Sequence, residues 1–384
     1  MSVHRRKTKG GTTWRVQWRD ESGRQRSRTF SLKRDADAWD AKVKLAKRQG
    51  ELAALDGGKQ RFREFVAEWQ ELYAIPHLAP RTLALYDDLL RRYLLPKIGD
   101  ASLRQLTTER LQRMSSELSQ EGVPAPTLRK TLMLLQGILE RAAEWGRIQS
   151  NPARYVRKPR QTAARRPDAL SPRQIESVRS QLLAKGRLRD ATLVSVLAYA
   201  GLRPGEALAL RWGDIGKGTI SVDKAISLGE VRTTKTRRAR TVRMLKPLAQ
   251  DLARFKLASG RPPDDALVFP TPSGYPWNDT DFRNWRRRHF RTAVEAAGLS
   301  RSTRPYDLRH SFASLLLAEQ TNPAEVAAQL GHTLQVLFST YAHVIEELRG
   351  AGRVDPAKEI RTARQNVTVA GKLPRAASAS KQSS

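Results

Sequence analysis

The spacing of apolar residues constrains this chain most. Apolar residues follow the two-residue period of a strand clearly at two places and the period of a helix along most of the rest. Near the N-terminus, Trp14, Val16 and Trp18 alternate with basic or polar residues, an arrangement that puts one set of side chains on each face of a strand. The second place comprises the short segments 219–222 and 240–242. The other regular segments have helical spacing. We therefore expect a mainly α-helical protein with small β elements, of the α+β class.

The first fifty residues predict a small basic unit, which we bound at 1–55. A turn at 21–24 follows the alternating segment, and then come a second strand pattern through 26–30 and a helical pattern at 35–49. Residues 1–50 contain fifteen Lys and Arg against five Asp and Glu. A basic sheet backed by one helix suits binding in a DNA groove, and a solvated basic face is the alternative. The side chains expected to contact DNA here are Arg15, Arg19, Arg26 and Arg28.

The charge of the whole chain narrows the class of partner. The formal net charge is +32, so a polyanion is expected, either nucleic acid or an acidic membrane surface. No apolar run is long enough to cross a bilayer, and the basic segment 1–9 lacks the apolar stretch of a secretory signal. No amphipathic anchor rich in Trp, Phe and Lys supports membrane binding. A cytoplasmic nucleic-acid-binding protein is the simplest expectation.

Cysteine and metal chemistry are not expected. The chain contains no cysteine, which excludes disulfides, cysteine metal sites and a cysteine nucleophile. None of the six histidines forms a helical zinc motif with a glutamate, so we predict no metal site and no cofactor.

Residues 60–150 predict a helical domain that follows a flexible joint at 56–58. Helical patterns cover the segment that starts at Phe62 and the ranges 82–95, 108–120 and 127–146, which together indicate four helices. The next segment, 151–167, has six basic residues, three prolines and no acid. We interpret it as an extended basic linker that lies on DNA phosphates, with Arg157 and Lys158 as contacts.

A further domain is expected at 168–355, followed by a tail at 356–384. Ser171 and Gln174 form a capping-box pattern, with Pro172 in the first turn of the helix that they begin. The tail is rich in Ala, Ser, Lys and Arg. We expect it to be flexible, with a short strand at 366–369. Further helices of this domain are predicted at 190–200, 247–258, 279–297, 308–319 and 323–330.

Two patterns in this domain point to chemistry on a phosphate. Arg203 precedes Pro204, which opens a helix, so its guanidinium lies at a helix mouth where phosphate is favoured. Glu206 follows within one turn and can orient that arginine. Lys235 lies in the loop between the two strand segments and can donate a proton to a leaving oxygen. Basic residues crowd this loop, and Lys224 is the alternative.

Two more patterns follow towards the C-terminus. Tyr306 and Arg309 are three residues apart and face one side of a helix, whereas His310 points elsewhere and is interpreted as structural. Asn322 can cap the start of the next helix. Gly331 ends that helix as its C-terminal cap, so His332 lies at a rigid helix exit. Tyr341 follows nine residues later.

In this order and spacing, the four patterns resemble the tyrosine recombinase, or phage-type integrase, family. The segments 306–314, 330–332 and 339–343 are close to the usual sequence motifs of that family. The resemblance is strongest over 168–350. Residues 62–150 look like the core-binding domain of the family, and residues 1–50 look like the arm-binding domain of phage and mobile-element integrases.

The resemblance implies a reaction and a set of roles. Tyr341 would attack a DNA phosphodiester and form a 3′-phosphotyrosyl bond without metal or ATP. The phosphate would be held by Arg203, Arg309 and His332. Lys235 would protonate the leaving 5′-oxygen, and Glu206 would hold Arg203. The implied partners are double-stranded DNA, three further copies of the chain on two duplexes, and an excisionase or a DNA-bending host factor.

One residue departs from the family pattern. Tyr306 stands where the family usually has histidine, and the ordinary pKa of tyrosine, near 10, makes it a poor general base at neutral pH. The identity of the general base is therefore open. The alternatives are a resolvase-type recombinase, which usually lacks the N-terminal sheet, a type IB topoisomerase, and a non-catalytic DNA-binding regulator, which only Tyr306 favours.

Overall fold

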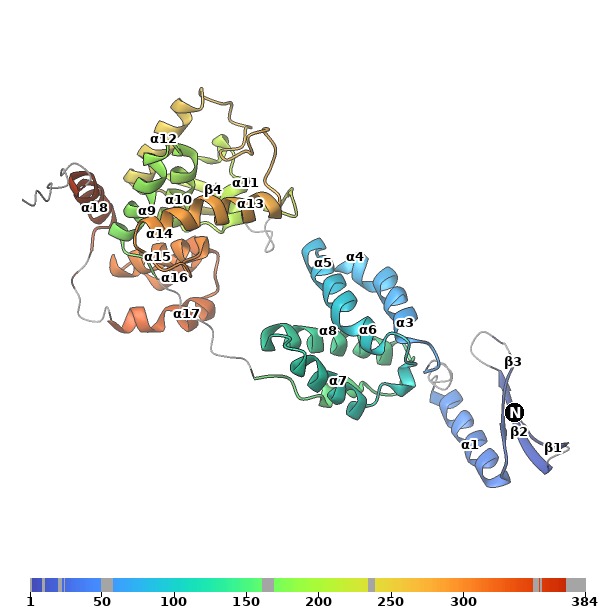
Figure 1. Cartoon of the computed structure of the whole chain (residues 1–384). Helices are drawn as coiled ribbons and strands as arrows, with labels where there is room; N and C mark the ends of the chain where they lie inside the picture. The colour runs from blue at the N-terminus through green and yellow to red at the C-terminus, as the bar shows by residue number, and fades with distance from the viewer. Residues whose placement is uncertain are drawn as a thin grey trace, which may run out of the picture. The chain divides into compact units, whose positions relative to one another are not determined.

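The computed structural model describes residues 2–8, 11–19, 23, 25–49, 58–160, 169–233, 239–347, 352 and 354–370. Contacts divide the chain into two units, residues 1–164 and 165–384, and each unit is described by itself (Figure 1). Within the described ranges both units are built mostly of helices, and the strands form three small sheets. The prediction of a mainly helical α+β protein is confirmed.

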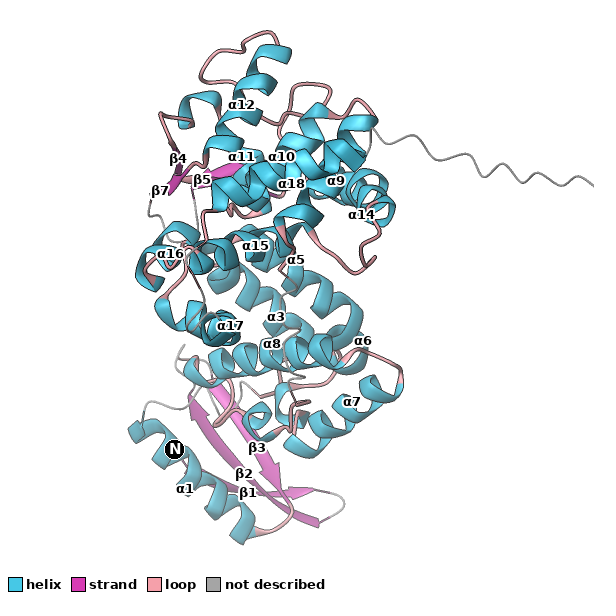
Figure 2. Ribbon diagram, turned by 90° about the vertical axis from the view of Figure 1, so that its left-hand side faces the viewer, coloured by secondary structure: helices cyan, strands magenta, loops and turns pink. Residues whose placement is uncertain are grey.

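The first unit begins with a three-stranded antiparallel sheet. Its strands β1 (Ser2–Thr8), β2 (Gly11–Arg19) and β3 (Gln25–Phe30) lie in chain order, and α1 (Lys33–Gln49) packs against them (Figure 2). The apolar set of the alternating segment forms the core of this sheet, where Val16 and Trp18 are buried. The sequence analysis missed β1, because its alternation is basic and polar and contains Val3 as its only apolar side chain facing the helix.

Four helical segments follow in the first unit, as predicted. Two of them continue through a single π-helical turn, so α3 runs on into α4 and α5 runs on into α6. Their apolar faces share one core with the two later helices. The elements are α3 (Phe62–Trp69), α4 (Ile75–His77), α5 (Pro80–Leu89), α6 (Leu95–Ile98), α7 (Thr108–Gln120) and α8 (Ala125–Glu144).

The predicted linker is not extended along its whole length. Its first part forms a short 3-10 turn (Pro152–Tyr155), and Asn151, Ala153 and Val156 are buried against the helical domain. Asn151 donates its side-chain amide to Glu140 and to the backbone oxygen of Gln136. Three buried side chains therefore fix the start of this segment despite its six basic residues. Residues 161–167 of the linker, and residues 56 and 57 of the joint, lie outside the described residues.

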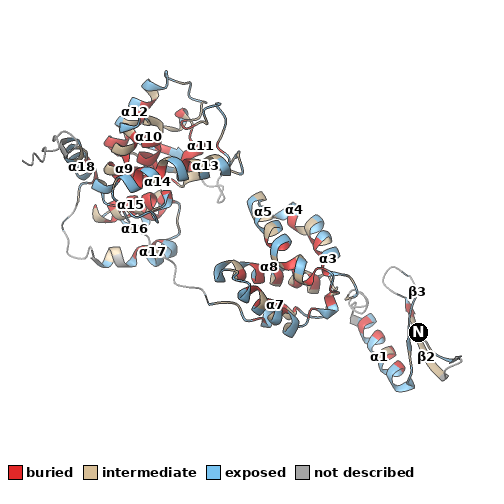
Figure 3. Cartoon of the chain, in the orientation of Figure 1, coloured by how far each residue is buried: buried red, intermediate tan, exposed pale blue. Residues whose placement is uncertain are grey.

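The second unit is organised around α10 (Leu188–Tyr199). Every residue from Asp190 to Tyr199 is buried, and α9 (Pro172–Ala184), α12 (Lys246–Ala258) and α15 (Pro305–Ala318) pack around it (Figure 3). The predicted capping box is present at the start of α9, where Ser171 accepts a hydrogen bond from the backbone of Gln174.

Two small two-stranded sheets interrupt the helices. β4 (Thr219–Val222) pairs with β7 (Arg240–Arg243), as predicted. Between them lies a hairpin that the sequence analysis missed, formed by β5 (Lys224–Ser227) and β6 (Glu230–Thr233). The remaining helices are α11 (Pro204–Ala209), α13 (Asp279–Trp285), α14 (Arg291–Ala296), α16 (Pro323–Leu330), α17 (Leu334–Glu347) and α18 (Pro356–Ala370).

The prediction for the tail is wrong over its described part. Residues 356–370 form α18, so neither a flexible segment nor a strand at 366–369 is present there. Ile360 and Ala363 are buried, and the helix packs against α9 and α12. Residues 371–384 lie outside the described residues. The Ala- and Lys-rich composition that suggested flexibility also suits a helix. Only a few apolar residues, such as Ile360 and Ala363, mark the face that packs against the domain.

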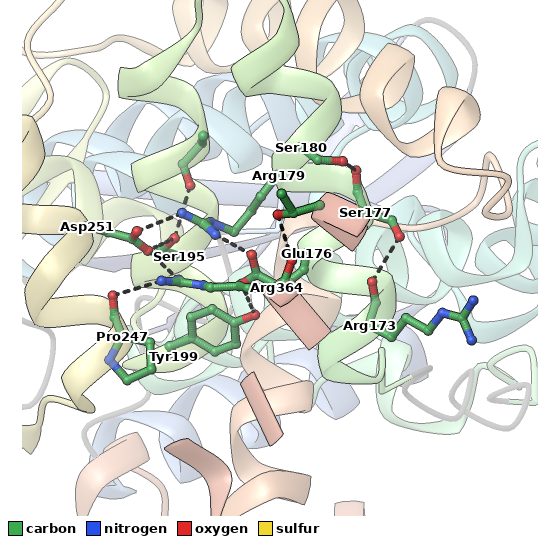
Figure 4. A network of polar contacts seen from close by, with 12 residues as sticks. Arg173, Glu176, Ser177, Arg179, Ser180, Ser195, Tyr199, Pro247, Asp251 and Arg364 are labelled. Atoms are coloured by element: carbon green, nitrogen blue, oxygen red, sulfur yellow. Dashed lines mark hydrogen bonds and ion pairs between the residues drawn. The ribbon is translucent and has the colours of Figure 1, made fainter. Parts of the chain in front are cut away.

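A buried ion network attaches α18 to the second unit (Figure 4). Arg364 contacts Asp251 at 2.7 Å and Glu176 at 3.2 Å, and Arg179 contacts the same two carboxylates. Tyr199 donates its hydroxyl to Glu176 at 2.6 Å. Burial alone would lower the pKa of Arg364, but the two carboxylates outweigh burial and raise it. Two cations therefore balance two anions between α9, α12 and α18.

Replacing Arg364 by Met should lower the free energy of unfolding. The change leaves two buried carboxylates with Arg179 as their shared cation, and breaking a buried pair typically costs about 3–5 kcal/mol. Urea unfolding followed by circular dichroism measures the loss. Arg361→Met, on the exposed side of the same helix, is the matched control and should change stability little. Equal stability of the two variants would contradict the structural role of the network.

Candidate active site

The predicted site residues of the second unit come from four separate segments. Arg203 precedes α11, Arg309 lies in α15, His332 follows α16, and Tyr341 lies in α17. Hydrogen bonds connect Arg203 and Arg309 to the end of α16, and connect Tyr341 to α15. The structure thus brings together residues that are up to 138 positions apart in the chain.

Three arginines bind three successive backbone carbonyls at the C-terminal end of α16. Arg240 donates its Nε to the oxygen of Gln329 at 2.9 Å, and Arg203 donates Nη2 to the oxygen of Gly331 at 2.9 Å. Arg309 donates Nη2 to the oxygen of Leu330, which lies between them. The last carbonyls of a helix have no partner within it and carry the negative end of its dipole, so cations are favoured there. This helix end therefore gathers three guanidinium groups.

The caps of α16 follow the prediction. Asn322 accepts a hydrogen bond from the backbone nitrogen of Ala324 at its start. Gly331 ends the helix with a φ of 62°, in the left-handed region where glycine is the least strained residue. The turn directs the chain away from the helix axis and places His332 beside Arg309.

Glu206 is the anion that orders two of the arginines. Its side chain is only 3% exposed, and it accepts hydrogen bonds from Arg203 at 2.8 Å and from Arg240 at 2.6 Å. Burial would raise the pKa of Glu206, but the hydrogen bonds and charges of Arg240 and Arg203 bring it below its usual range. Glu206 therefore stays ionised and fixes both guanidinium groups, as predicted for Arg203. The role of Arg240 was not predicted, because Arg240 is one of several basic residues crowded in and after the loop that contains Lys235.

Arg309 is buried completely, with 0% of its surface exposed. Besides Leu330, it donates Nη1 to the backbone oxygen of Gly201, and its Nη2 lies 3.0 Å from Nε2 of His332. Burial and the neighbouring charge of Arg203 lower the pKa of Arg309 to about 10, so it remains a cation at neutral pH.

His332 is held in one tautomer by Arg309. A guanidinium can only donate, so Nε2 of His332 accepts and the neutral ring carries its proton on Nδ1. Burial and the charges of Arg309 and Arg203 lower the pKa of His332 to about 3, so the ring is neutral at physiological pH. Within the described part of the chain, Nδ1 of His332 and Nε of Arg309 are buried and have no hydrogen-bond partner. Buried donors without a partner are rare and often mark a site that binds an acceptor.

Tyr341 is buried in α17 with 1% of its surface exposed, and its hydroxyl contacts α15. The hydroxyl oxygen lies 2.5 Å from Nδ1 of His310. Burial raises the pKa of Tyr341 well above its usual value, even though Arg309 acts in the opposite direction. The phenol is therefore protonated at neutral pH.

His310 was predicted to point away from the side of the helix that carries Tyr306 and Arg309 and to be structural. The predicted direction of its side chain is wrong. Spacing along a single helix separates His310 from Arg309, but α17 approaches α15 from another side and meets the face that carries His310. The ring of Tyr306 also lies on this face, with its centroid 5.3 Å from that of His310. The four-residue spacing of Tyr306 and His310 was the signal that could have linked these two rings.

The remaining predicted site residues are placed as follows. Tyr306 is 39% exposed at the start of α15. Lys235 lies outside the described residues, so its position stays a prediction. The alternative, Lys224, lies in β5 and is 3.5 Å from Asp223.

The four N-terminal arginines divide between two faces of the sheet. Arg26 and Arg28 pair with Trp18 and Val16, so they lie on the face that α1 partly covers, and Arg28 lies 4.2 Å from the ring centroid of Trp39. Arg15 and Arg19 lie on the opposite face, where Arg15 donates to Ser27 at 2.7 Å. Arg157 is exposed and Lys158 half-buried in the linker. Contact of any of these side chains with DNA stays a prediction.

The described part of the chain has neither a cluster of metal ligands nor a membrane-spanning helix. No group of three or more His, Asp or Glu side chains in that part of the chain could hold a metal ion. None of its helices is long and apolar enough to cross a membrane.

Comparison with known proteins agrees with the geometry. Residues 169–347 match the phage integrase family, and residues 61–119 match the N-terminal SAM-like domain of phage integrases. Together the two matches cover more than half of the chain.

The individual relatives are named as integrases or tyrosine recombinases. A tyrosine recombinase of Pseudothermotoga lettingae is 25% identical over 72% of this chain and 92% of its own length. The putative prophage phiRv2 integrase of Mycobacterium tuberculosis is 27% identical over 86% of this chain and 88% of its own. The match to prophage integrase IntR of Escherichia coli, at 26% identity, spans 60% of each chain.

The fold is also similar to that of a lambda integrase tetramer bound to a Holliday junction. The TM-score is 0.57 at 18% identity, and the match covers 86% of this chain and 95% of that one. The family matches, the named relatives and the fold agree with the residues gathered around Tyr341. The chain therefore belongs to the phage integrase family and is a tyrosine-type site-specific recombinase.

Proposed function

We propose that Tyr341 cuts DNA and holds the cut strand as a 3′-phosphotyrosyl bond, and that the protein integrates and excises a phage or mobile element. The tyrosine oxygen attacks a phosphodiester, the bond from phosphorus to the 5′-oxygen breaks, and a 5′-hydroxyl leaves. The 5′-hydroxyl of a partner strand then attacks the phosphotyrosine and releases Tyr341. One phosphoester replaces another in each step, so no external energy is consumed.

The observation that supports this proposal best is the group of donors beside one buried tyrosine. Arg203 is 38% exposed and can offer a planar fork to non-bridging phosphate oxygens. Nδ1 of His332 and Nε of Arg309 are donors that lack a protein acceptor among the described residues. Donors that are fixed before the reaction stabilise the charge that develops on phosphorus, and losing one typically costs about 2.7–4 kcal/mol in barrier.

The charge of the chain supports DNA as the substrate. A net charge of +32 provides many phosphate contacts, so we expect affinity to fall steeply with salt concentration. Arg15 and Arg19, on the face of the sheet away from α1, suit contact with a second DNA segment. Arg157 and Lys158, in the basic linker, would lie on DNA phosphates.

The proposal extends to assembly. By analogy with the lambda integrase tetramer, four copies of this chain would act on two duplexes and exchange one pair of strands at a time. We further propose an excisionase or a DNA-bending host factor as a partner and the cytoplasm, at the nucleoid, as the location of the reaction, in line with the family resemblance.

Relaxation of supercoiled plasmid tests the covalent step without knowledge of the target site. In EDTA and without ATP, the protein should relax the plasmid slowly and remain attached to DNA after denaturation. Tyr341→Phe should do neither, because it lacks the attacking oxygen, while it keeps the affinity for plasmid measured by gel shift. Equal relaxation by both proteins would remove Tyr341 as the nucleophile. Binding by both without relaxation by either would instead favour a non-catalytic regulator.

The role of Lys235 is tested in the same assay. Lys235→Ala should lower the rate of covalent complex formation by about a hundred- to ten-thousand-fold, because the leaving oxygen loses its proton donor. Plasmid affinity should change little, since one of many cations is removed. Lys224→Ala is the matched control and should react normally. A loss of rate in the control alone would transfer the role to Lys224.

A further inference from the structure

We propose that His310 is the general base of this site, which takes the proton of the Tyr341 hydroxyl as that oxygen attacks phosphorus. This inference rests on the proposed function. It identifies the general base, which is open because Tyr306 stands where the family usually has histidine. The observation that carries it is the contact between Nδ1 of His310 and the hydroxyl oxygen of Tyr341, at 2.5 Å. A base must lie within hydrogen-bond reach of the proton that it removes, and this distance meets that requirement.

The direction of the hydrogen bond follows from the chemistry of the two groups. Burial keeps the phenol of Tyr341 protonated, so the hydroxyl has one proton to donate. His310 is the partner of that hydroxyl among the hydrogen bonds of the described residues. A neutral imidazole with its proton on Nε2 has a lone pair on Nδ1 that can accept this proton.

The surroundings of His310 keep it neutral and therefore able to act as a base. Burial lowers the pKa of His310, Asp307 acts to raise it, and Arg309 acts to lower it. The other groups that face this ring are the phenols of Tyr306 and Tyr341, of which burial keeps Tyr341 protonated, and the imidazole of His332, which burial and Arg309 keep neutral.

The other candidate bases among the site residues are excluded by the partners that they already have. Nε2 of His332 accepts from Arg309 and its Nδ1 carries the proton, so this ring has no free lone pair. Glu206 is committed to Arg203 and Arg240 by four hydrogen bonds from their side chains and the backbone of Arg203. Tyr306 carries a phenol, which is by its chemistry a far weaker proton acceptor than an imidazole. His310 is left as the acceptor that touches the reacting oxygen.

The step is balanced in both directions. In cleavage, the O–H bond of Tyr341 breaks, its proton moves to Nδ1 of His310, and the tyrosine oxygen bonds to phosphorus. The bond from phosphorus to the 5′-oxygen breaks, and that oxygen takes a proton from a separate donor, for which Lys235 is proposed. In rejoining, the attacking 5′-hydroxyl gives its proton back to that donor and its oxygen bonds to phosphorus. The bond from phosphorus to the tyrosine oxygen breaks, and the imidazolium of His310 returns its proton to that oxygen. His310 is thus base in one half-reaction and acid in the other.

The experiment measures covalent complex formation on supercoiled plasmid by wild type, His310→Ala and His310→Asn. Both variants should react roughly a hundred-fold or more slowly, because positioned general bases contribute about that much. His310→Asn keeps a polar side chain of similar size and cannot take up the proton, so it separates loss of the base from loss of packing. Plasmid affinity and melting temperature establish that each variant is folded. His289→Ala, a half-buried histidine of the same unit, is the matched control and should react normally.

Chemical rescue gives a readout that a purely structural role would not produce. Imidazole added to His310→Ala should restore part of the rate, in proportion to the concentration of neutral imidazole. The wild-type rate should fall as pH falls through the lowered pKa of His310, and this inflection should disappear from the variant.

Three results would overturn the inference. Wild-type rates in both variants would show that His310 is not needed, and faster variants would show that it only restrains Tyr341. Slow variants that imidazole does not rescue, with the pH inflection unchanged, would limit His310 to packing. If wild type itself forms no covalent complex while it binds plasmid, the proposed function fails, and this inference fails with it.

Discussion

The C-terminal end of α16 is the feature on which the rest of the site depends. Its carbonyls at Gln329, Leu330 and Gly331 each accept a hydrogen bond from a different arginine. Like charges packed together repel, and burying even one costs several kcal/mol unless it is well paired. The negative end of the helix dipole and the single carboxylate of Glu206 provide this pairing. The cluster remains cationic overall, so it is suited to an anion such as phosphate.

Arg309 connects this arginine cluster to His332 and to the helix that carries His310. Because Arg309 is fully buried and bound to the carbonyl of Leu330, the last residue of α16, and to that of Gly201, just after α10, its position is fixed before any ligand arrives. That position sets the tautomer of His332 and leaves a donor at Nδ1. The next residue along α15, His310, contacts the proposed nucleophile, Tyr341, from another side. The proposed roles in anion binding and proton removal thus fall to adjacent residues with separate partners.

Much of this arrangement could be predicted from the sequence, because its signals are local. The caps at Ser171 and Asn322, the glycine at 331 and the alternation around Val16 each depend on neighbours within a few residues, and all are confirmed. The order and spacing of the predicted catalytic residues supplied the family, which the comparisons confirm.

What could not be predicted depends on contacts between distant segments. The direction of His310 is set by α17, the role of Arg240 by Glu206, and the order of the tail by a carboxylate pair on α9 and α12 that Arg364 completes. Charged residues of this kind look the same in sequence whether they are exposed or paired. Only the approach of a second element decides which of them become part of a site.

The central claim is that Tyr341, and no other tyrosine, becomes bonded to DNA. Tyr306 is the natural competitor, because it lies in the same group of rings and is far more exposed. The most direct measurement digests the protein–DNA adduct with nuclease and trypsin and locates the residual nucleotide by mass spectrometry. We predict that the nucleotide is on the peptide that contains Tyr341. A nucleotide on the peptide that contains Tyr306 would contradict the account.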